Sequence, residues 1–434
     1  MAVPFDPRDT VRLGAMSGFQ VLAVVLCILM NMMDGFDILA AGFTAPAIAR
    51  HFALGSEAVG LFLGASPAGM ILGALFLAPL ADRWGRRATV LVCLATIAAG
   101  MGATASAASL APLLIGRLIT GIGVGALMAA VNTVVAEFSN EQRREMAVCL
   151  QAAGFPAGGV VGGLAFYFLG GMDWRLVYAI GALISLLFVP AVLVALPDSL
   201  DFLIERRPPN ALVRVNALLR RMNRPPVAAL PVPKASIVGV AAALRSPGAP
   251  GICAGFFLMM LTFYFLSSWI PTILTGAGRS IHIGVSASIL MSLGGVVGDI
   301  LFALGTTRWK ARALGAVFCL LTFACALLVA MTLHLDAVLL VAALGLGMFL
   351  YGAMASHYAV VPALFPATAR ASGTGLALGI GRIGATLGPV LGGVLFAHGG
   401  DPVVTVGVMA LPLVICAALL KGMGKRAEAG MRGR

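Results

Sequence analysis

Two aspartates stand three residues apart in "MNMMDGFDILAAGF", residues 30–43, a stretch that is otherwise almost wholly apolar. Residues i and i+3 of a helix lie on nearly one face, so Asp34 and Asp37 should be neighbours. Two close carboxylates in a medium of low dielectric disfavour double ionisation, so one of them should hold a proton near neutral pH. Such a group suits proton coupling, with either aspartate as the carrier and the other structural. A purely structural hydrogen-bonded pair is the alternative.

Three further charged residues lie inside apolar runs. Arg117 begins "RLITGIGVGA" and Arg382 lies in "GIGRIGATLG", close to the middle of its run. A guanidinium stays charged and offers a planar fork of donors that suits a carboxylate. Arg382 is therefore a candidate for binding the anion of a substrate, and Arg117 is a candidate partner for one of the two aspartates. Asp299 should pair with an arginine or line a gate.

A flat substrate would be recognised by flat side chains inside the spans. The candidates are Tyr264, Trp269, Tyr351, His357 and Tyr358, with Gln151 as a further polar candidate. Packing is the plainer interpretation of each aromatic residue, and an interfacial anchor is the plainer one for Trp269. His357 could shuttle protons or be a satisfied polar residue.

The composition is that of a membrane protein. Of the 434 residues, 60% are hydrophobic and 11% are charged, and a soluble fold cannot bury so much apolar surface. Backbone groups in lipid must be satisfied internally, and long unbroken apolar runs favour helices over a barrel. The N-terminal stretch has no small-residue cleavage site after a short apolar core, so we expect no removed signal peptide.

The net charge of +12 does not indicate a nucleic-acid partner, because the basic residues fall mostly between the apolar runs. The seven cysteines lie inside those runs without metal-ligand spacing and are predicted to be packing residues. Neither a metal nor a cofactor is indicated.

The sequence predicts twelve transmembrane helices. The apolar runs are approximately 20–48, 57–81, 89–107, 110–136, 145–169, 176–196, 250–275, 284–305, 313–333, 337–364, 372–397 and 403–420. A polar stretch rich in Pro and Arg separates the first six from the last six. We therefore expect an N-terminal half (1–196), a central loop (197–249) and a C-terminal half with a tail (250–434).

Basic residues orient these spans. If both termini are cytoplasmic, the cytoplasmic segments hold 24 of the 29 Lys and Arg: two, three, two, eight, three, one and five in chain order. The opposite loops hold only Arg50, Arg175 and Arg279. Positive charge concentrates on the cytoplasmic side, so the distribution predicts this orientation in the inner (plasma) membrane.

The two halves resemble each other at a nearly constant offset along the chain. Pro46 matches Pro271, and at the same offset Gly73, Arg83 and Trp84 match Gly298, Arg308 and Trp309. At nearly that offset, "AEFSNEQR" (136–143) matches "ALFPATAR" (363–370). Several matches in order imply duplicated six-helix halves, a design found in transporters whose halves rock about a central site.

These features resemble the major facilitator superfamily. "LADRWGRRATV" (80–90) looks like its loop motif, and "RLITGIGVGA" (117–126) looks like its arginine motif in the fourth span. Within the superfamily, "DGFDILAAGFTAPAIA" (34–49) and "YFLSSWIPTIL" (264–274) resemble the aromatic acid:proton symporters. The second loop-motif copy, "TTRWKAR" (306–312), has lost its acid. The Gly-Pro signature of antiporters is reduced to "GFPAGGVVGG" (154–163) in span five, and its fuller version lies in span eleven.

The resemblance implies a role for Arg117 in proton coupling, and it assigns a gating role to the loop motif. In this interpretation the motif's residues latch the cytoplasmic face in one conformational state, whereas a purely topological role is the alternative. These residues are Asp82, Arg83, Gly85, Arg86 and Arg87.

The sequence thus predicts an all-α membrane protein with the major facilitator fold. The resemblance implies a monomeric, proton-driven importer of a small aromatic carboxylate, such as a hydroxybenzoate. An exporter of cationic or amphipathic drugs is the first alternative, with the two aspartates binding the amine, although Arg382 argues against it. A receptor or scaffold derived from a transporter is the second. No enzyme is indicated, because no nucleophile–base constellation or cofactor fingerprint is present.

Overall fold

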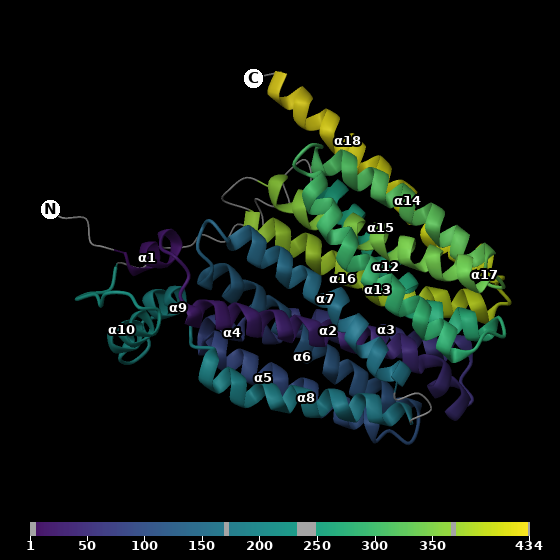
Figure 1. Ribbon diagram of the computed structural model, residues 1–434, viewed down its shortest axis with the longest axis horizontal. Coiled ribbons are helices and arrows are strands. Elements are labelled where there is room, and N and C mark those ends of the chain that lie inside the picture. The colour runs from purple at the N-terminus through teal and green to yellow at the C-terminus, as the bar shows by residue number, and fades with distance from the viewer. Residues whose placement is uncertain (1–5, 169–172, 232–248, 366–369, 433–434) are drawn as a thin grey trace.

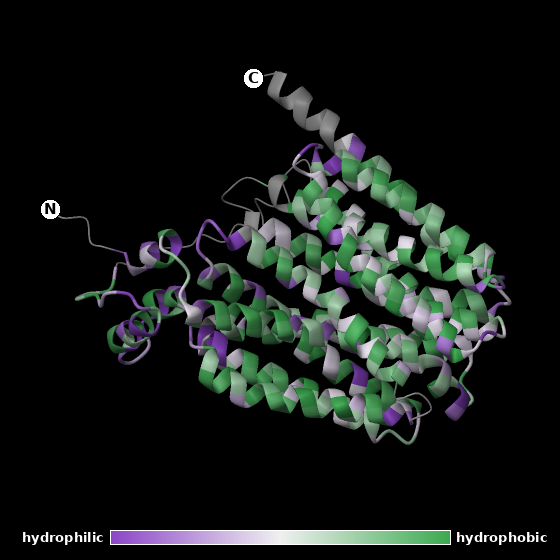
Figure 2. Cartoon of the chain, viewed as in Figure 1, coloured by the Kyte–Doolittle hydropathy of each residue, from purple (hydrophilic) through white to green (hydrophobic). Residues whose placement is uncertain are grey.

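The computed structural model describes residues 6–168, 173–231, 249–365 and 370–432. Within these ranges the regular structure is entirely helical. Twelve helical segments of the described chain are long and apolar enough to cross a membrane, as predicted. Figure 2 shows that these helices consist largely of hydrophobic residues, coloured green.

The membrane-spanning helices form two sets that lie side by side (Figure 1). The first set is α2 (Gly18–His51), α3 (Ser56–Leu72) with its π-helical continuation η1 (Gly73–Leu77), α5 (Arg86–Ala105), α6 (Leu110–Phe138), α7 (Arg144–Phe168) and α8 (Trp174–Ala195). The second set is α12 (Ala249–Gly276), α13 (Ile281–Gly305), α14 (Ala311–Met331), α15 (Asp336–Ala363), α16 (Arg370–Ala397), and α17 (Pro402–Ala410) with α18 (Pro412–Arg432).

The helices of the two sets repeat with the spacing of the sequence matches. Helix α3 begins at Ser56 and α13 at Ile281, which lie at the offset that separates Pro46 from Pro271. Trp84 and Trp309, a matched pair in the sequence, are both exposed, Trp84 at the end of α4 (Leu80–Trp84) and Trp309 in the turn between α13 and α14. The helix order therefore follows the internal repeat.

The ends of the spans differ in charge. We call one end the basic end: it carries α1 (Pro7–Leu13), α4 (Leu80–Trp84), the turn at residues 139–143, α9 (Leu200–Arg206) and α10 (Ala211–Arg221). The opposite end, with the turns after His51 and Gly276, is called the far end. In Figure 1, α1, α9 and α10 gather at one side of the molecule and α17 reaches the other.

Three sequence expectations need correction. The second span was expected to reach residue 81, but η1 ends at Leu77, and the chain turns through Pro79 before α4. The last span is divided between α17 and α18, because Pro412 has no N–H to continue the helical hydrogen bonds. Cys149 is exposed, whereas five of the other six cysteines are buried packing residues as expected.

The central loop also contains regular structure. Helices α9 and α10 occupy part of the stretch expected to be only a polar loop. The buried residues of α10 are Ala211, Val215, Leu218 and Leu219, which follow the helical period. Helix α10 packs against α9. The amphipathic pattern was present in the sequence but was hidden among arginines and prolines.

The two halves meet through α2 and α12, through α3 and α16, and through α7 and α13. On the far-end side these contacts bring backbone against backbone. A Cβ on Gly60 would lie 2.8 Å from the carbonyl oxygen of Pro389, and one on Gly42 would lie 3.0 Å from that of Ser268. Small residues permit this close approach. In the described chain, the glycine contacts between the halves all lie between Arg382 and the far end.

Candidate functional site

Asp34 and Asp37 lie on α2, where it crosses the middle of the bundle. Asp34 is 4% exposed and Asp37 is fully buried. Asp37 forms an ion pair with Arg117 of α6 and accepts a hydrogen bond of 3.1 Å from the Ser66 hydroxyl of α3. The expected partnership of Arg117 with a first-span aspartate is therefore present, and Asp37 is the aspartate concerned.

Aromatic rings enclose this ion pair. The Arg117 guanidinium lies 5.8 Å from the ring centre of Phe62 and 5.6 Å from that of Tyr178. The hydroxyl of Tyr178 is 2.9 Å from that of Thr44. All of these residues belong to the N-terminal half, so the pair is internal to that half.

Asp34 has a different environment. Within the described chain it makes no ion pair, and its buried Oδ1 has no hydrogen-bond partner. Its charge acts on that of Arg382, which comes from α16 in the other half. An uncompensated carboxylate here is costly unless it is protonated or satisfied by a ligand.

Arg382 presents a cation at the junction of the halves. Its Nη1 donates to the Tyr264 hydroxyl at 3.4 Å and contacts the sulfur of Met70. Among the described residues no carboxylate lies within ion-pair distance of it. Both groups that it contacts are neutral, so the guanidinium retains donors for an incoming anion.

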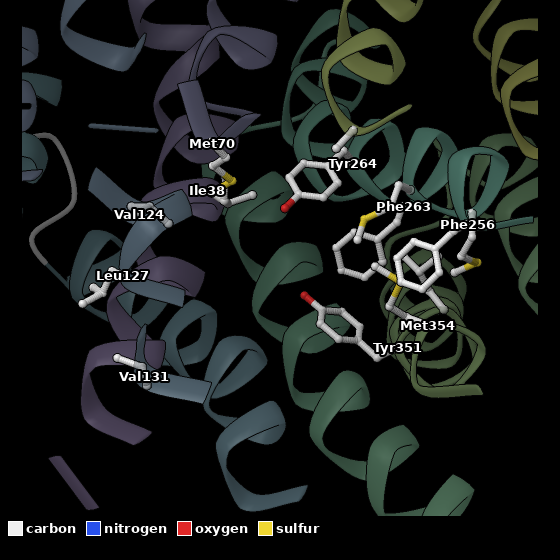
Figure 3. Close-up of a cluster of buried hydrophobic side chains, with 14 of the residues drawn as sticks. Ile38, Met70, Val124, Leu127, Val131, Phe256, Phe263, Tyr264, Tyr351 and Met354 are labelled. Carbon is white, nitrogen blue, oxygen red and sulfur yellow. The ribbon is translucent and has the colours of Figure 1, made fainter. Parts of the chain in front are cut away.

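Four aromatic residues from three helices form a cluster beside Arg382, here called the aromatic cage: Phe155 of α7, Phe263 and Tyr264 of α12, and Tyr351 of α15. The ring centres of Phe263 and Tyr351 are 5.0 Å apart, and Phe155 lies 6.2 Å from each of them. Figure 3 shows the hydroxyls of Tyr264 and Tyr351 pointing to the same side, toward Ile38 and Met70.

Tyr358 of α15 is 46% exposed, and its hydroxyl lies within electrostatic range of Arg382, Asp34 and Asp299. The glycine contacts between the halves lie on the far-end side of Arg382.

Other predicted binding residues lie elsewhere. Trp269 donates its indole N–H to the Pro389 carbonyl at 3.0 Å and packs on Phe396, between α12 and α16. It is 2% exposed, so the interpretation as an interfacial anchor is wrong. His357 is buried against Phe256, with its Nδ1 2.9 Å from the Ala353 carbonyl.

Gln151 belongs to a separate polar cluster. Its side-chain amide donates to Asn132 of α6, and its backbone carbonyl accepts from the Asn31 side chain of α2. Asn31 precedes Asp34 by three residues on α2, so the cluster continues the polar face of that helix toward the basic end.

The loop motif contacts the N-terminal half and the central loop. Arg86 pairs with Glu137 of α6 at 3.3 Å and lies over the Phe202 ring, and Arg87 donates its backbone N–H to Asp198. Gly85 has φ +95, and a Cβ there would lie 2.3 Å from an Asp198 oxygen, so only glycine fits. Arg83 is exposed. The side chain of Asp82 lies outside the part of the chain that the structure describes.

Asp299 differs from expectation. The described chain gives it neither an ion pair nor a hydrogen bond, although pairing with an arginine was the expected structural role. Its charge acts instead on the hydroxyls of Tyr351 and Tyr358.

Sequence reasoning missed several residues of this region. Phe155 lies in a segment whose glycines and proline are the stronger pattern, and Phe263 stands beside the polar Tyr264. Ser66 carries no distinctive pattern. Asn31 did have a signal, since it lies three residues before Asp34 on an apolar helix.

Two repeated sets of membrane-spanning helices, with buried charges and aromatic rings at their junction, are the architecture of a secondary transporter. Comparison with known families agrees. Residues 27–357 match the family model of the Major Facilitator Superfamily, so the chain belongs to that superfamily. The protein is thus a multi-pass membrane transport protein and not an enzyme, as the sequence predicted.

Its relatives include named transporters of aromatic acids. The chain is 29% identical to the 4-hydroxybenzoate transporter PcaK of Pseudomonas aeruginosa, over 98% of this chain and 97% of that one. It is 30% identical to the gallate transporter of Pseudomonas putida, over 91% and 90%. It is 29% identical to the 3-(3-hydroxy-phenyl)propionate transporter of Escherichia coli, over 90% and 89%. The resemblance to aromatic-acid transporters is therefore confirmed along nearly the whole chain.

Solved structures show the same fold. The xylose transporter XylE from E. coli, in a partially occluded inward-open conformation, aligns with a TM-score of 0.75 at 16% identity, covering 94% of this chain and 98% of that one. At this identity the likeness concerns the fold alone.

Proposed function

We propose that this protein imports a small aromatic carboxylate together with protons, across the inner membrane and as a monomer. The observation that carries the proposal is the pairing of an uncompensated cation, Arg382, with an aromatic cage at the junction of the halves. A cation next to flat apolar rings suits a ligand that is itself an anion on an aromatic ring. The names of the relatives support this substrate class.

In this proposal the substrate's carboxylate binds the Arg382 guanidinium. The Tyr264 hydroxyl already accepts from Arg382, so it can help to hold the bound anion in place. The substrate's ring lies against Phe263, Phe155 and Tyr351. Because Phe155 and Arg382 come from opposite halves, the loaded site joins the two halves.

Proton coupling follows from a charge balance around Arg382. Asp34 and the substrate are both anions, and one arginine compensates only one of them. Protonation of Asp34 removes the second negative charge from a buried site, where it would be costly. Substrate and proton therefore bind together, and Asp34 is the group that takes the proton.

The Asp37–Arg117 pair has a supporting role in this scheme. The pair is already neutral and is enclosed by the N-terminal half, so it holds α2 and α6 together one helical turn from Asp34. Protonation of Asp37 would leave Arg117 as a buried cation without a counter-ion, which is costly. Asp37 therefore stays ionised, and Asp34 is the carboxylate that exchanges the proton.

Alternating access would use both ends of the molecule. In the present conformation glycine contacts join the halves on the far-end side. We propose that the site opens toward the basic end, and that this end is cytoplasmic with both termini. Closure of that end would bring the loop motif and Asp299 toward the opposite half, as a gate. A benzoate-like anion entering a cell is opposed by ~2.3 kcal/mol per charge per 100 mV, and the accompanying proton cancels this cost.

Uptake into proteoliposomes tests the proposal. Radiolabelled hydroxybenzoates, an aliphatic acid and an organic cation are supplied with and without an inward proton gradient, to wild type, to Arg382→Gln and to a control, Arg50→Gln. We expect gradient-driven accumulation of aromatic acids that fails in Arg382→Gln and persists in the control. Movement of the cation without any aromatic acid would overturn the proposal in favour of a drug exporter.

A further inference from the structure

Tyr351 has an unusual combination of burial and incomplete hydrogen bonding. It is 4% exposed, and its hydroxyl has no hydrogen-bond partner in the described chain. Leaving a buried hydroxyl without a partner is destabilising, so such a group is expected to meet a partner in some state of the protein. If Tyr351 served only for packing, phenylalanine would do as well at this position.

The ring of Tyr351 is held in place on two sides. A Cβ on Gly295 of α13 would lie 2.6 Å from its Cδ2 atom, so the ring lies flat against that helix. On another side Phe263 contacts it edge-on, with ring centres 5.0 Å apart at an angle of 76°. The hydroxyl therefore has a defined position at the border of the aromatic cage.

Phe263 contacts two tyrosines whose hydroxyls point to the same side (Figure 3). Its ring centre lies 5.6 Å from that of Tyr264, which accepts from Arg382. It lies 5.0 Å from that of Tyr351. A ring that lies along Phe263 with its carboxylate at Arg382 would thus direct its opposite edge toward the Tyr351 hydroxyl.

The charges around Tyr351 restrict what can bind there. Asp299 and Asp34 both act electrostatically on its hydroxyl, whereas Arg382 is at the other position of the cage. A second carboxylate on the ligand would be repelled by these acids. A hydroxyl group is neutral, accepts from Tyr351 and can donate to an acid, so it fits the site.

Building on the proposed function, we propose that Tyr351 determines substrate specificity by recognising a hydroxyl on the ring position remote from the carboxylate. The site then prefers 4-hydroxybenzoate to benzoate, and benzoate to terephthalate. Benzoate would leave the Tyr351 hydroxyl buried and unsatisfied, which is a larger penalty than the mere loss of one hydrogen bond.

Tyr351→Phe tests this inference, because it removes the hydroxyl and keeps the ring. Affinities for 4-hydroxybenzoate and benzoate are measured by competition binding to the purified protein in detergent, with Tyr167→Phe as the matched control. We expect the variant to bind 4-hydroxybenzoate on the order of five- to tenfold more weakly. It should bind benzoate as well as or better than wild type, because no buried hydroxyl is left unsatisfied.

The outcomes separate this inference from the proposed function. An unchanged ratio of the two affinities, or an equal loss for both ligands, would overturn the role of Tyr351 while leaving aromatic-acid binding intact. Wild type that binds neither compound would overturn the proposed function itself. Terephthalate that binds as tightly as 4-hydroxybenzoate would refute the electrostatic part of the inference.

Discussion

Asp34 and Asp37 share one helix face, yet their neighbours differ in charge. Asp37 is compensated by Arg117 and Ser66, whereas Asp34 makes no ion pair in the described chain and is acted on by the charges of Arg382 and Asp37. Two identical side chains can therefore have different functions, because the groups that surround each carboxylate decide whether its charged form is tolerated.

At the residue scale, Asp34→Asn should separate binding from coupling. The amide resembles the protonated acid in size and charge, so the substrate still binds at Arg382, but no proton is released. We expect counterflow exchange of a labelled aromatic acid to persist, and accumulation driven by a proton gradient to fall at least tenfold. Full accumulation in this variant would place the coupling proton on another group.

The buried ion pair supplies a second residue-scale prediction. Asp37→Asn leaves the guanidinium of Arg117 buried without a counter-ion, which costs on the order of 3–5 kcal/mol. We expect a clearly lower Tm in detergent for this variant, and partial recovery in the double variant Asp37→Asn/Arg117→Gln, where no buried charge remains. If the Tm of the double variant is no higher than that of Asp37→Asn, the structural role of the pair is contradicted.

At the element scale, the far end depends on backbone contact between α3 and α16. A Cβ on Gly393 would lie 3.0 Å from the Cα of Gly60, and one on Gly60 would lie 2.8 Å from the Pro389 carbonyl oxygen. Backbone atoms cannot move aside as a flexible side chain can. The close approach of the two helices is therefore what allows the far end to close.

Gly60→Val should hold the far end apart. We expect uptake to fall and the distance between spin labels at positions 54 and 277, measured in a cysteine-free background, to increase. Gly55→Val is the control, because a Cβ on Gly55 meets no atom within 4 Å. Unchanged label distances in Gly60→Val would show that these glycines do not limit closure.

At the scale of the whole molecule, charge separates the two ends. The layer of α1, α9 and α10 is attached to the N-terminal half by hydrogen bonds, such as those from Arg224 to the Ala15 carbonyl and from Asn140 to the Gly14 carbonyl. A basic layer that is tied to one half should move with that half during transport. It also concentrates positive charge at one membrane surface.

Reporter fusions check the orientation that this asymmetry predicts. Green fluorescent protein at the C-terminus should fluoresce, and alkaline phosphatase there should be inactive, because both termini should face the cytoplasm. A cysteine introduced at position 278 should react from outside with an impermeant maleimide. The reverse pattern would mean that the basic end faces outward.

By itself the sequence determined the helical class, the number of spans, the internal repeat and the list of charged residues inside the membrane. These properties depend on composition and on order along the chain, which the bilayer converts directly into spans. Asp34, Asp37, Arg117 and Arg382 were all identified in this way, because charge within an apolar run is visible without coordinates.

Only the tertiary structure decided which of these groups face one another. The position of a residue in the sequence indicates its depth along a helix, but not the rotation of that helix or its neighbours. The pairing of Arg117 with Asp37, the lack of a hydrogen-bond partner for Asp34 Oδ1 among the described residues and the placing of Phe155 beside Tyr351 all depend on lateral packing between distant helices. Packing of that kind is set by many weak contacts at once, such as the glycine contacts of α3 and α16, and no local pattern reports it.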